Sequence, residues 1–215
     1  MRRPVEIEFA VNLDARTKSG TFYLLQIRPM VDMKANLTED LTLIPEERLL
    51  LKSENSLGHG VMDDIHDVIY VKTEGYSASN NQLIAYDIEK LNRRFLDEEK
   101  HYVLVGPGRW GSSDTWLGIP VKWPNISAAR VIVEAGLTNY RIDPSQGTHF
   151  FQNLTSFGVG YFTINAYMND GLYNQELLNS MPAVEETKFI RWVHFDKPLS
   201  VKMDGKKKIG VVEIG

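Results

Sequence analysis

The chain has 215 residues, enough for one large domain or two small ones. Apolar residues make up 43% and charged residues 24%, a balance typical of a folded globular protein and not of a disordered chain. The formal net charge of −4 disfavours a nucleic-acid-binding surface, no apolar run approaches the roughly 18 residues of a membrane span, and the lack of cysteine excludes disulfides and thiol catalysis. We therefore expect a cytoplasmic protein with neither nucleic-acid nor membrane partners.

The first predicted element is an antiparallel hairpin from Val5 to Met30. Polar and apolar residues alternate with period two in both of its arms, as in strands that bury one face. The polar segment Asn12 to Gly20 between the arms suits a hairpin loop. In the second arm, this alternation predicts one face made by Tyr23, Leu25 and Ile27 and the opposite face made by Leu24, Gln26 and Arg28.

Pairing of the two arms would gather four polar side chains, Glu6, Glu8, Gln26 and Arg28, on one side of the hairpin. Carboxylate and amide oxygens are hard ligands that suit Mg²⁺, and an arginine fork suits phosphate oxygens. The residue types are those of a magnesium–phosphate site. The alternative from the spacing alone is a solvated strand face, with the charged residues outside and the aliphatic residues inside.

Both arms carry a recognisable motif. Glu6-Ile7-Glu8-Phe9 and Leu25-Gln26-Ile27-Arg28-Pro29 resemble the closing strands of the ATP-grasp nucleotide-binding domain in the phosphoenolpyruvate synthase and pyruvate phosphate dikinase family. There the strands read approximately [DE]-I-E-[WF] and L-Q-x-R. The resemblance implies that Glu8 and Gln26 hold a Mg²⁺–ATP complex, that Arg28 contacts the transferred phosphoryl group, and that Glu6 is an additional metal carboxylate.

The resemblance also implies an organisation of the chain. Residues 1–48 correspond to the C-terminal remnant of the ATP-grasp domain and a linker, and residues 49–215 to a second α/β domain. The expected partners are a nucleotide, the upstream N-terminal part of the same chain, and pyruvate or another small phosphoryl acceptor in the full-length protein. Because most of a nucleotide site and the family's terminal barrel would lie outside these residues, we expect the fragment alone to be inactive.

The clearest downstream element is a helix from Asn81 to Glu99, since Ile84, Ile88, Leu91 and Phe95 recur at helical spacing. The segment Val31 to Glu47 is polar and predicts a linker. Short apolar runs predict strands at Asp67–Lys72, Tyr102–Val105, Ala129–Glu134 and Val159–Ile164, and a C-terminal β-meander at Lys188–Phe195, Leu199–Met203 and Lys208–Ile214.

The strand at Tyr102–Val105 runs directly into a glycine-rich turn that begins Gly106-Pro107-Gly108-Arg109. One interpretation is an anion-binding loop, in which backbone N–H groups at Gly106 and Gly108 act together with the Arg109 guanidinium. The other is a strained turn that presents Arg109 and Trp110 for structural reasons. The sequence matches neither of the common nucleotide-loop motifs.

His149 follows Gly147-Thr148 at the expected start of a short helix, where free N–H groups and the helix dipole favour a phosphate. The order of parts is similar to the swivelling phosphohistidine domain of the same family, which implies that His149 is a phosphoryl carrier. The sequence departs from that motif, because Phe150 and Phe151 stand where the family has alanines. The alternative is a capping or packing histidine.

The sequence thus predicts a mixed α/β protein: a partial ATP-grasp hairpin followed by a compact α/β domain that ends in a β-meander. The predicted function is that of the C-terminal part of an ATP- and Mg²⁺-dependent phosphotransferase. The alternative is a non-catalytic nucleotide- or ligand-binding regulatory module derived from the same family, which would sense its ligand through the turn from Gly106 to Asp114.

Overall fold

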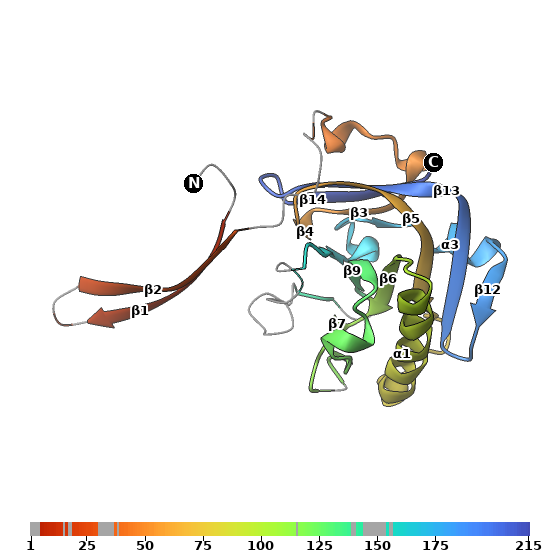
Figure 1. Cartoon of the computed structure of the whole chain (residues 1–215), viewed down its shortest axis with the longest axis horizontal. Helices are drawn as coiled ribbons and strands as arrows, with labels where there is room; N and C mark the ends of the chain where they lie inside the picture. Colours follow the sequence, from red (N-terminus) through yellow and green to blue (C-terminus); the bar gives the residue numbers. More distant parts are fainter. Residues whose placement is uncertain are drawn as a thin grey trace.

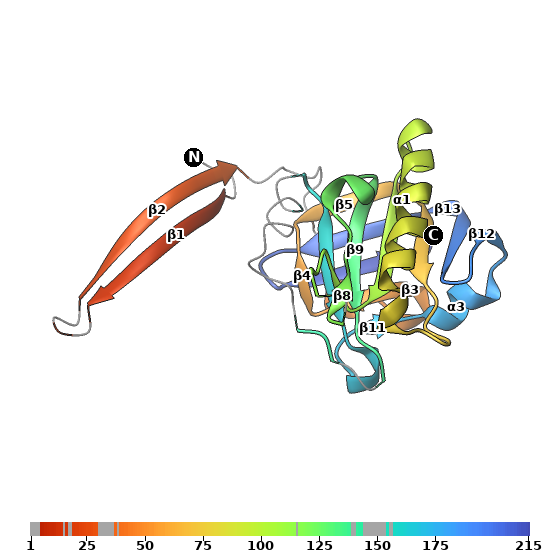
Figure 2. The ribbon, with the colours of Figure 1, turned by 90° about the horizontal axis from the view of Figure 1, so that it is seen from below.

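The computed structural model describes residues 5–14, 16, 19–29, 37, 39–114, 116–138, 141–143, 154 and 157–215. At Glu6, Asp14, Arg28 and Pro29 it describes the backbone alone. The described residues form a mixed α/β structure that is mostly strands (49%), with a ten-strand mixed sheet and one long helix. Figures 1 and 2 show the N-terminal hairpin extending away from this sheet.

The hairpin consists of β1 (Val5–Asp14) and β2 (Ser19–Pro29), which pair antiparallel. The strands extend further toward the tip than the sequence predicts, so that the loop shrinks to four residues, 15–18. One irregularity lies between Glu8 and Phe9, where the partners change from Gln26 to Leu24 and Leu25 forms a bulge. The bulge shifts the alternation of β2 by one residue.

The shift corrects the predicted faces of β2. Cross-strand partners share a face, so Leu24 joins Ile27 on the side of Phe9, while Tyr23 joins Gln26 on the side of Glu8. One face is consequently apolar along the whole hairpin, with the pairs Ile7–Ile27, Phe9–Leu24 and Val11–Phe22. The rings of Phe9 and Phe22 stack on it with centroids 5.0 Å apart.

The large sheet runs in the order β11-β3-β14-β13-β5-β6-β9-β10-β4, and β12 pairs with β13. Its strands are β3 (Leu49–Ser53), β4 (Asn55–Leu57), β5 (Gly60–Val71), β6 (Tyr102–Pro107), β9 (Ala129–Ala135), β10 (Gly160–Ile164), β11 (Leu172–Tyr173), β12 (Ala183–Glu186), β13 (Ile190–Asp204) and β14 (Ile209–Glu213). The strands β5, β6, β9 and β10 are parallel neighbours, whereas the other pairs are antiparallel.

The sheet curls back on itself, because β3 and β4 are consecutive and lie near opposite ends of the strand order. β3 pairs with β14 and β4 pairs with β10, with only Glu54 between them. The N–H of Ser56 also donates to the carbonyl of Lys208 at 2.9 Å, and the Ser53 hydroxyl donates to the carbonyl of Thr163 at 2.7 Å. These contacts close the sheet into a barrel-like body.

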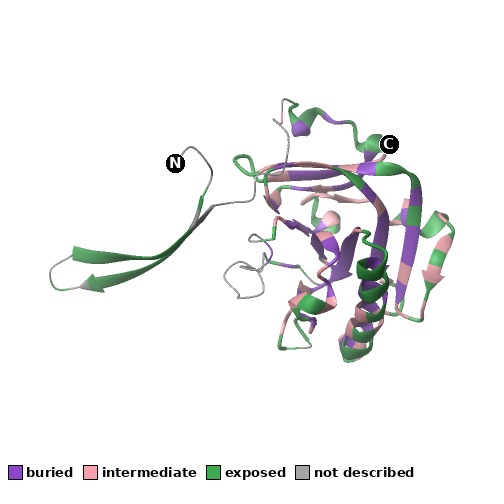
Figure 3. Ribbon diagram, in the orientation of Figure 1, coloured by how far each residue is buried: buried purple, intermediate pink, exposed green. Residues whose placement is uncertain are grey.

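Alternating residues of the closed sheet supply two cores (Figure 3). The inner core includes Val68, Val103, Val131, Phe162 and Val201, all fully buried. The outer core lies between the sheet and α1 (Asn81–Asp97), whose Ile84, Ile88, Leu91 and Phe95 pack against the other face of β5, β6, β9 and β13. The predicted helix and its apolar stripe are therefore confirmed, with the helix ending two residues earlier.

Two sequence-based boundaries are corrected by packing. Part of the predicted linker folds onto the body as 3-10 turns at Leu41–Leu43 and Glu46–Arg48, because Leu41 and Ile44 are buried against Leu49 and Val211. Two of the expected meander strands form one continuous strand, β13, which bends where its pairing with β5 is irregular between His194 and Leu199. β13 and β14 pair antiparallel from Asp204 and Ile209 onward, as expected for consecutive meander strands.

Small elements complete the described part of the chain. β7 (Arg109–Trp110) and β8 (Gly118–Ile119) form a separate parallel pair, a 3-10 turn covers Trp123–Asn125, and α3 (Gln175–Ser180) precedes β12. Further 3-10 turns lie at Ala78–Asn80 and Ala166–Met168. No helix among the described residues has the length and apolar character needed to cross a membrane.

Candidate functional sites

The register of the hairpin brings the four predicted polar residues onto one face. Glu8 lies directly opposite Gln26, and Glu6 lies directly opposite Arg28. Directly opposed residues of an antiparallel pair have Cβ atoms about 4.5–5.5 Å apart, and adjacent pairs on the same face are also neighbours. The backbone positions of these four residues are therefore grouped on one face of a short stretch of the hairpin.

Glu8 and Gln26 carry the kinds of oxygen that can bind Mg²⁺ in a nucleotide complex. Among the described side chains, no group of three or more histidines, aspartates and glutamates is placed to hold a metal ion. Mg²⁺ typically takes only one or two protein ligands and completes its octahedron with phosphate and water oxygens. The Glu8 carboxylate and the Gln26 amide oxygen meet that requirement, and the side chains of Glu6 and Arg28 lie outside the described atoms.

The opposite, apolar face of the hairpin is exposed. Ile7, Phe9, Phe22 and Leu24 are each about half exposed, and Leu13 is 77% exposed. β1 and β2 pair only with each other in the described sheets, so no described strand extends the hairpin (Figure 3). A two-stranded hairpin alone is marginally stable in water. This face therefore has the properties of a surface that packs against another element.

The glycine-rich turn after β6 is built from internal hydrogen bonds. The N–H of Arg109 donates to the carbonyl of Leu117 at 3.0 Å, that of Gly111 to Ile119 at 2.9 Å, and that of Trp110 to the Glu134 carboxylate at 3.0 Å. These three amides are thus engaged within the protein. The Glu134 carboxylate is itself buried and also accepts from the Tyr161 hydroxyl. These bonds give the turn a structural role, and the anion-binding role expected for Gly106, Gly108 and the Arg109 guanidinium stays a prediction.

The glycines of this turn are required by close packing. A Cβ on Gly106 would lie 2.4 Å from the Trp110 ring, and Gly108 has a φ of +78° with the Leu117 carbonyl 3.0 Å from a Cβ position. Arg109 lies on the short strand β7 and is half-buried. Gly106 has a second role, because it lines a cavity next to the turn.

That cavity, of about 240 Å³, lies at the carboxyl ends of the four parallel strands. The last residues of these strands, Val71, Pro107, Ala135 and Ile164, all belong to its wall. The carboxyl edge of parallel strands is the usual place for a ligand in open α/β sheets. Sequence analysis missed this site because no local motif marks it. Its polar members, among them Thr73 and Thr138, stand just after strands, and that position is the signal that could have indicated them.

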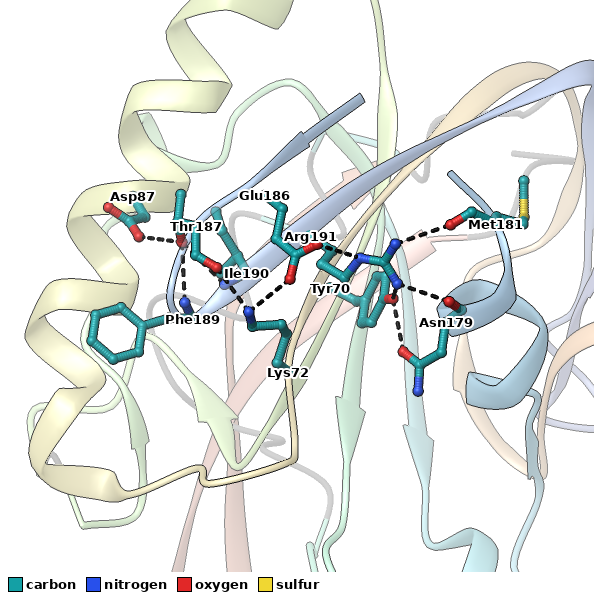
Figure 4. Close-up of polar contacts among 10 residues, drawn as sticks. All are labelled: Tyr70, Lys72, Asp87, Asn179, Met181, Glu186, Thr187, Phe189, Ile190 and Arg191. Carbon is teal, nitrogen blue, oxygen red and sulfur yellow. Dashed lines mark hydrogen bonds and ion pairs between the residues drawn. The ribbon is translucent and has the colours of Figure 1, made fainter. Parts of the chain in front are cut away.

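A polar network beside the cavity fixes α3 to the sheet (Figure 4). Arg191 donates from Nη1 to the Tyr70 hydroxyl at 3.1 Å and to the Asn179 carbonyl at 3.0 Å, and from Nη2 to the Met181 carbonyl at 2.9 Å. Its Nε lies 3.1 Å from Glu186 Oε2, an ion pair without hydrogen-bond geometry. The guanidinium is thus occupied by the protein.

The network continues through Lys72 to α1. Lys72 Nζ donates to Glu186 Oε1 and to the Thr187 carbonyl, both at 2.8 Å, and the Thr187 hydroxyl donates to Asp87 Oδ2 at 2.7 Å (Figure 4). The ammonium of Lys72 holds the pKa of the Glu186 carboxyl below its usual value. The Glu186 carboxyl is therefore charged near neutral pH. The network connects α1, β12, β13 and α3 into one rigid wall beside the cavity.

The remaining predicted residue, His149, lies outside the described residues, so its expected role as phosphoryl carrier stays a prediction. Comparison of the chain with protein-family models, with curated proteins and with solved structures finds no match. What these sites can do therefore has to be inferred from the residues that form them.

Proposed function

We propose that this chain contributes part of a Mg²⁺–ATP site to an ATP-dependent phosphotransferase that resembles phosphoenolpyruvate synthase and pyruvate phosphate dikinase. One observation carries the proposal: Glu8 is paired with Gln26 and Glu6 with Arg28 on the same face of the hairpin. A register one residue away would separate the carboxylates from the amide and the guanidinium.

In the proposed site, the Glu8 carboxylate and the Gln26 amide oxygen hold the metal against the nucleotide phosphates, and Glu6 supplies a second carboxylate. Arg28 donates to the oxygens of the phosphoryl group that is transferred, where a planar fork can make two parallel hydrogen bonds. Bound Mg²⁺ neutralises charge on the phosphates and orients them for transfer. The proposed acceptor is His149, which would pass the phosphoryl group to pyruvate or another small acceptor.

The exposed apolar face of the hairpin supports the same proposal. A strand pair that closes a larger domain needs one face to pack on the rest of that domain and another to carry the site. The hairpin has the two different faces that such a position needs: a continuous apolar face that includes Phe9, Val11 and Phe22, and a polar face that includes Glu8 and Gln26.

A second candidate function is a non-catalytic nucleotide- or ligand-binding regulatory module. The cavity at the carboxyl ends of the parallel strands favours it, because Gly106 of the glycine-rich turn is part of the cavity wall. The two candidates differ in a simple measurement. A regulatory module binds ATP or another ligand without turnover, whereas a phosphotransferase consumes the nucleotide.

The test uses the full-length protein incubated with Mg²⁺ and ATP labelled in the β or γ position. We expect labelled phosphate on the protein that is stable to alkali and labile to acid, as phosphohistidine is. A Glu8→Gln variant should lose most of this label, because it removes the metal-binding charge with little change in shape. Absence of any acid-labile label in the unmodified protein would contradict the proposal.

Two further variants provide a control for Glu8→Gln and a test of His149 as the acceptor. Glu47→Gln makes the same chemical change at an exposed glutamate on the body and should leave labelling unchanged. His149→Ala should abolish labelling if His149 is the acceptor, while nucleotide binding remains. If Glu8→Gln lost the label and His149→Ala kept it, the proposed nucleotide site would stand. The phosphoryl acceptor would then be a histidine other than His149.

A further inference from the structure

A second hollow, of about 330 Å³, is lined by β5, β13 and the residues that lead from α1 into β6. Every described residue that lines it is ionisable. Its members are three histidines, one lysine and four acidic residues: His66, His101, His194, Lys100, Asp64, Asp67, Glu99 and Asp196. With neutral histidines, four carboxylates against one ammonium give the lining a formal charge of −3. The hollow therefore attracts cations.

Two of these histidines lie next to each other on neighbouring strands. The rings of His66 on β5 and His194 on β13 have centroids 5.5 Å apart and planes 13° from parallel. His66 Nδ1 lies 2.9 Å from the Phe195 carbonyl oxygen, and His194 Nδ1 lies 2.9 Å from Asp67 Oδ1. Because a carbonyl or a carboxylate can only accept, the neutral form of each ring carries its proton on Nδ1 and a lone pair on Nε2.

The orientation of His194 is fixed from behind by a buried carboxylate. Asp67 is 3% exposed and lies directly opposite His194 in the β5–β13 ladder. Its Oδ1 also accepts from Trp192 Nε1 at 2.7 Å. Histidines that bind a metal through one ring nitrogen usually donate from the other to a carboxylate or a backbone carbonyl. His194 has the first kind of partner and His66 has the second.

We propose that His66 and His194 together bind one borderline divalent cation, such as Zn²⁺ or Cu²⁺, through their Nε2 atoms. Imidazole nitrogen suits these ions, whereas Mg²⁺ prefers oxygen ligands. Metal–nitrogen distances of about 2.0–2.1 Å place the centres of two imidazoles on one ion about 5 Å apart, close to the 5.5 Å observed. The broad torsion about the Cβ–Cγ bond of histidine allows the small rotation that brings both Nε2 atoms to the ion.

The structure also defines what kind of metal site this is. No group of three or more histidines, aspartates and glutamates among the described side chains is placed to hold a metal ion, so water completes the coordination of an ion held by two. His101 is not a ligand, because its Nδ1 lies 3.3 Å from the Ala128 carbonyl and its Nε2 lies 3.0 Å from Arg130 Nη2. Binding is therefore weaker and more exchangeable than in the four-ligand sites that hold folds together.

The test is a calorimetric titration of the full chain with Zn²⁺, which meets no competing thiolate because the sequence has no cysteine. We expect one Zn²⁺ per chain, not displaced by millimolar Mg²⁺. His66→Gln and His194→Gln should each weaken binding at least about tenfold. His59→Gln makes the same change at an exposed histidine outside the hollow and should leave binding unchanged. Absence of Zn²⁺ binding, or unchanged binding in His66→Gln and His194→Gln, would overturn the proposal.

A measurement on the unmodified protein does not depend on how well the variants fold. Long-range ¹H–¹⁵N NMR spectra of histidine side chains distinguish the two ring nitrogens and show which one carries the proton. Zn²⁺ should shift the Nε2 signals of two of the five histidines, and both of these rings should carry their proton on Nδ1. Shifts confined to a single ring, or at Nδ1 in place of Nε2, would overturn the proposal.

Asp67 acts through His194 and is therefore a positioning residue. Asp67→Asn removes the charge but keeps an acceptor oxygen, so it should weaken Zn²⁺ binding about tenfold and lower the fraction of His194 that carries its proton on Nδ1. A lower Tm with unchanged affinity and unchanged tautomer would show that Asp67 has only a structural role, and would overturn this assignment.

The proposal does not depend on the hairpin, which contains no histidine. Phosphoryl labelling tests the hairpin residues, and the Zn²⁺ titrations test the pair on β5 and β13. Each proposal can therefore fail without the other.

Discussion

The hairpin and the closed sheet differ in how far they bury their apolar residues. The hairpin has one continuous apolar face, and the closed sheet has one against α1 and another around its inner core. In the closed sheet both faces are covered, and residues such as Phe162 and Val201 are fully buried (Figure 3). In the hairpin the corresponding residues, such as Phe9 and Phe22, are about half exposed. The closed sheet is stabilised by its own core, whereas the hairpin needs a partner surface to gain comparable burial.

This difference also separates two kinds of site. The hairpin has a polar face, which we propose acts on a nucleotide, and an exposed apolar face. The cavity has no charged residue in its described lining, and strand ends form it together with the segments that follow them. Changes in the closed sheet should therefore affect stability, and changes in the hairpin should affect function with little cost in stability.

The largest effect is expected in the free energy of unfolding, when a phenylalanine of the closed sheet is compared with one of the hairpin. Phe162→Ala removes a fully buried ring from the inner core and should lower the free energy of unfolding by about 3–5 kcal/mol. Phe22→Ala removes a ring that is 56% exposed and should cost less than about 1 kcal/mol. Urea denaturation of the full chain measures both. Equal costs would mean that the hairpin is as firmly packed as the sheet.

The next effect tests the closure of the sheet. A Cβ on Gly210 of β14 would lie 2.3 Å from the Phe162 ring and 2.9 Å from the Ser56 side chain on β4. Gly210→Ala should therefore lower the free energy of unfolding by about 1–3 kcal/mol through overpacking. Gly75→Ala is a poor control because Gly75 has a φ of +68°, so Ser127→Ala at a partly exposed turn serves instead. A neutral Gly210→Ala would contradict the closure.

A smaller effect is expected in how the stability of the closed-sheet body depends on pH. Burial and the neighbouring Arg130 lower the pKa of His101 below its usual 6.5. Arg130 Nη2 lies 3.0 Å from His101 Nε2, a contact that needs the neutral ring. The unfolded chain then binds a proton that the folded chain does not, so stability should fall as pH decreases through 6.5. His101→Gln should flatten this slope in urea titrations at pH 5–8; an unchanged slope would contradict the assignment.

The smallest effect tests the segment before the sheet. A hydrogen bond from Lys207 and others from Thr42 lower the pKa of Asp40 from 3.8 to about 2. A carboxyl with a lowered folded-state pKa stabilises the protein above its unfolded pKa, and this stabilisation is lost as pH falls from about 3.8 to about 2. Asp40→Asn should therefore reduce the acid sensitivity of unfolding in that window. Asp97→Asn, at the exposed end of α1, should not.

Much of the closed-sheet body could be predicted because local sequence patterns indicate its helix and strands. The stripe from Ile84 to Phe95 has helical spacing, and runs such as Tyr102–Val105 are apolar throughout, as strands buried on both faces are. The segment around Leu41 and Ile44 was predicted as a linker because its few apolar residues form no periodic run. Their burial depends on Leu49 and Val211, which the sequence pattern of the segment does not contain.

The sites were also predictable only where local sequence patterns determine them. The sequence could place Glu6, Glu8, Gln26 and Arg28 on one face because alternation and antiparallel pairing suffice for that. It could not predict the bulge at Leu25, since a one-residue insertion in the ladder leaves no compositional mark. The cavity was missed because its walls are ends of four strands brought together by the parallel order of the sheet.

The most direct test of the proposed function is a crystal structure of the full-length protein with Mn²⁺ in place of Mg²⁺ and a non-hydrolysable ATP analogue, with the metal located by its anomalous signal. The account predicts the metal at coordination distance, about 2.1 Å as for Mg²⁺, from the Glu8 carboxylate or the Gln26 amide oxygen, with Arg28 on a phosphate. A nucleotide and metal bound elsewhere, with Glu8, Gln26 and Arg28 facing solvent, would contradict it.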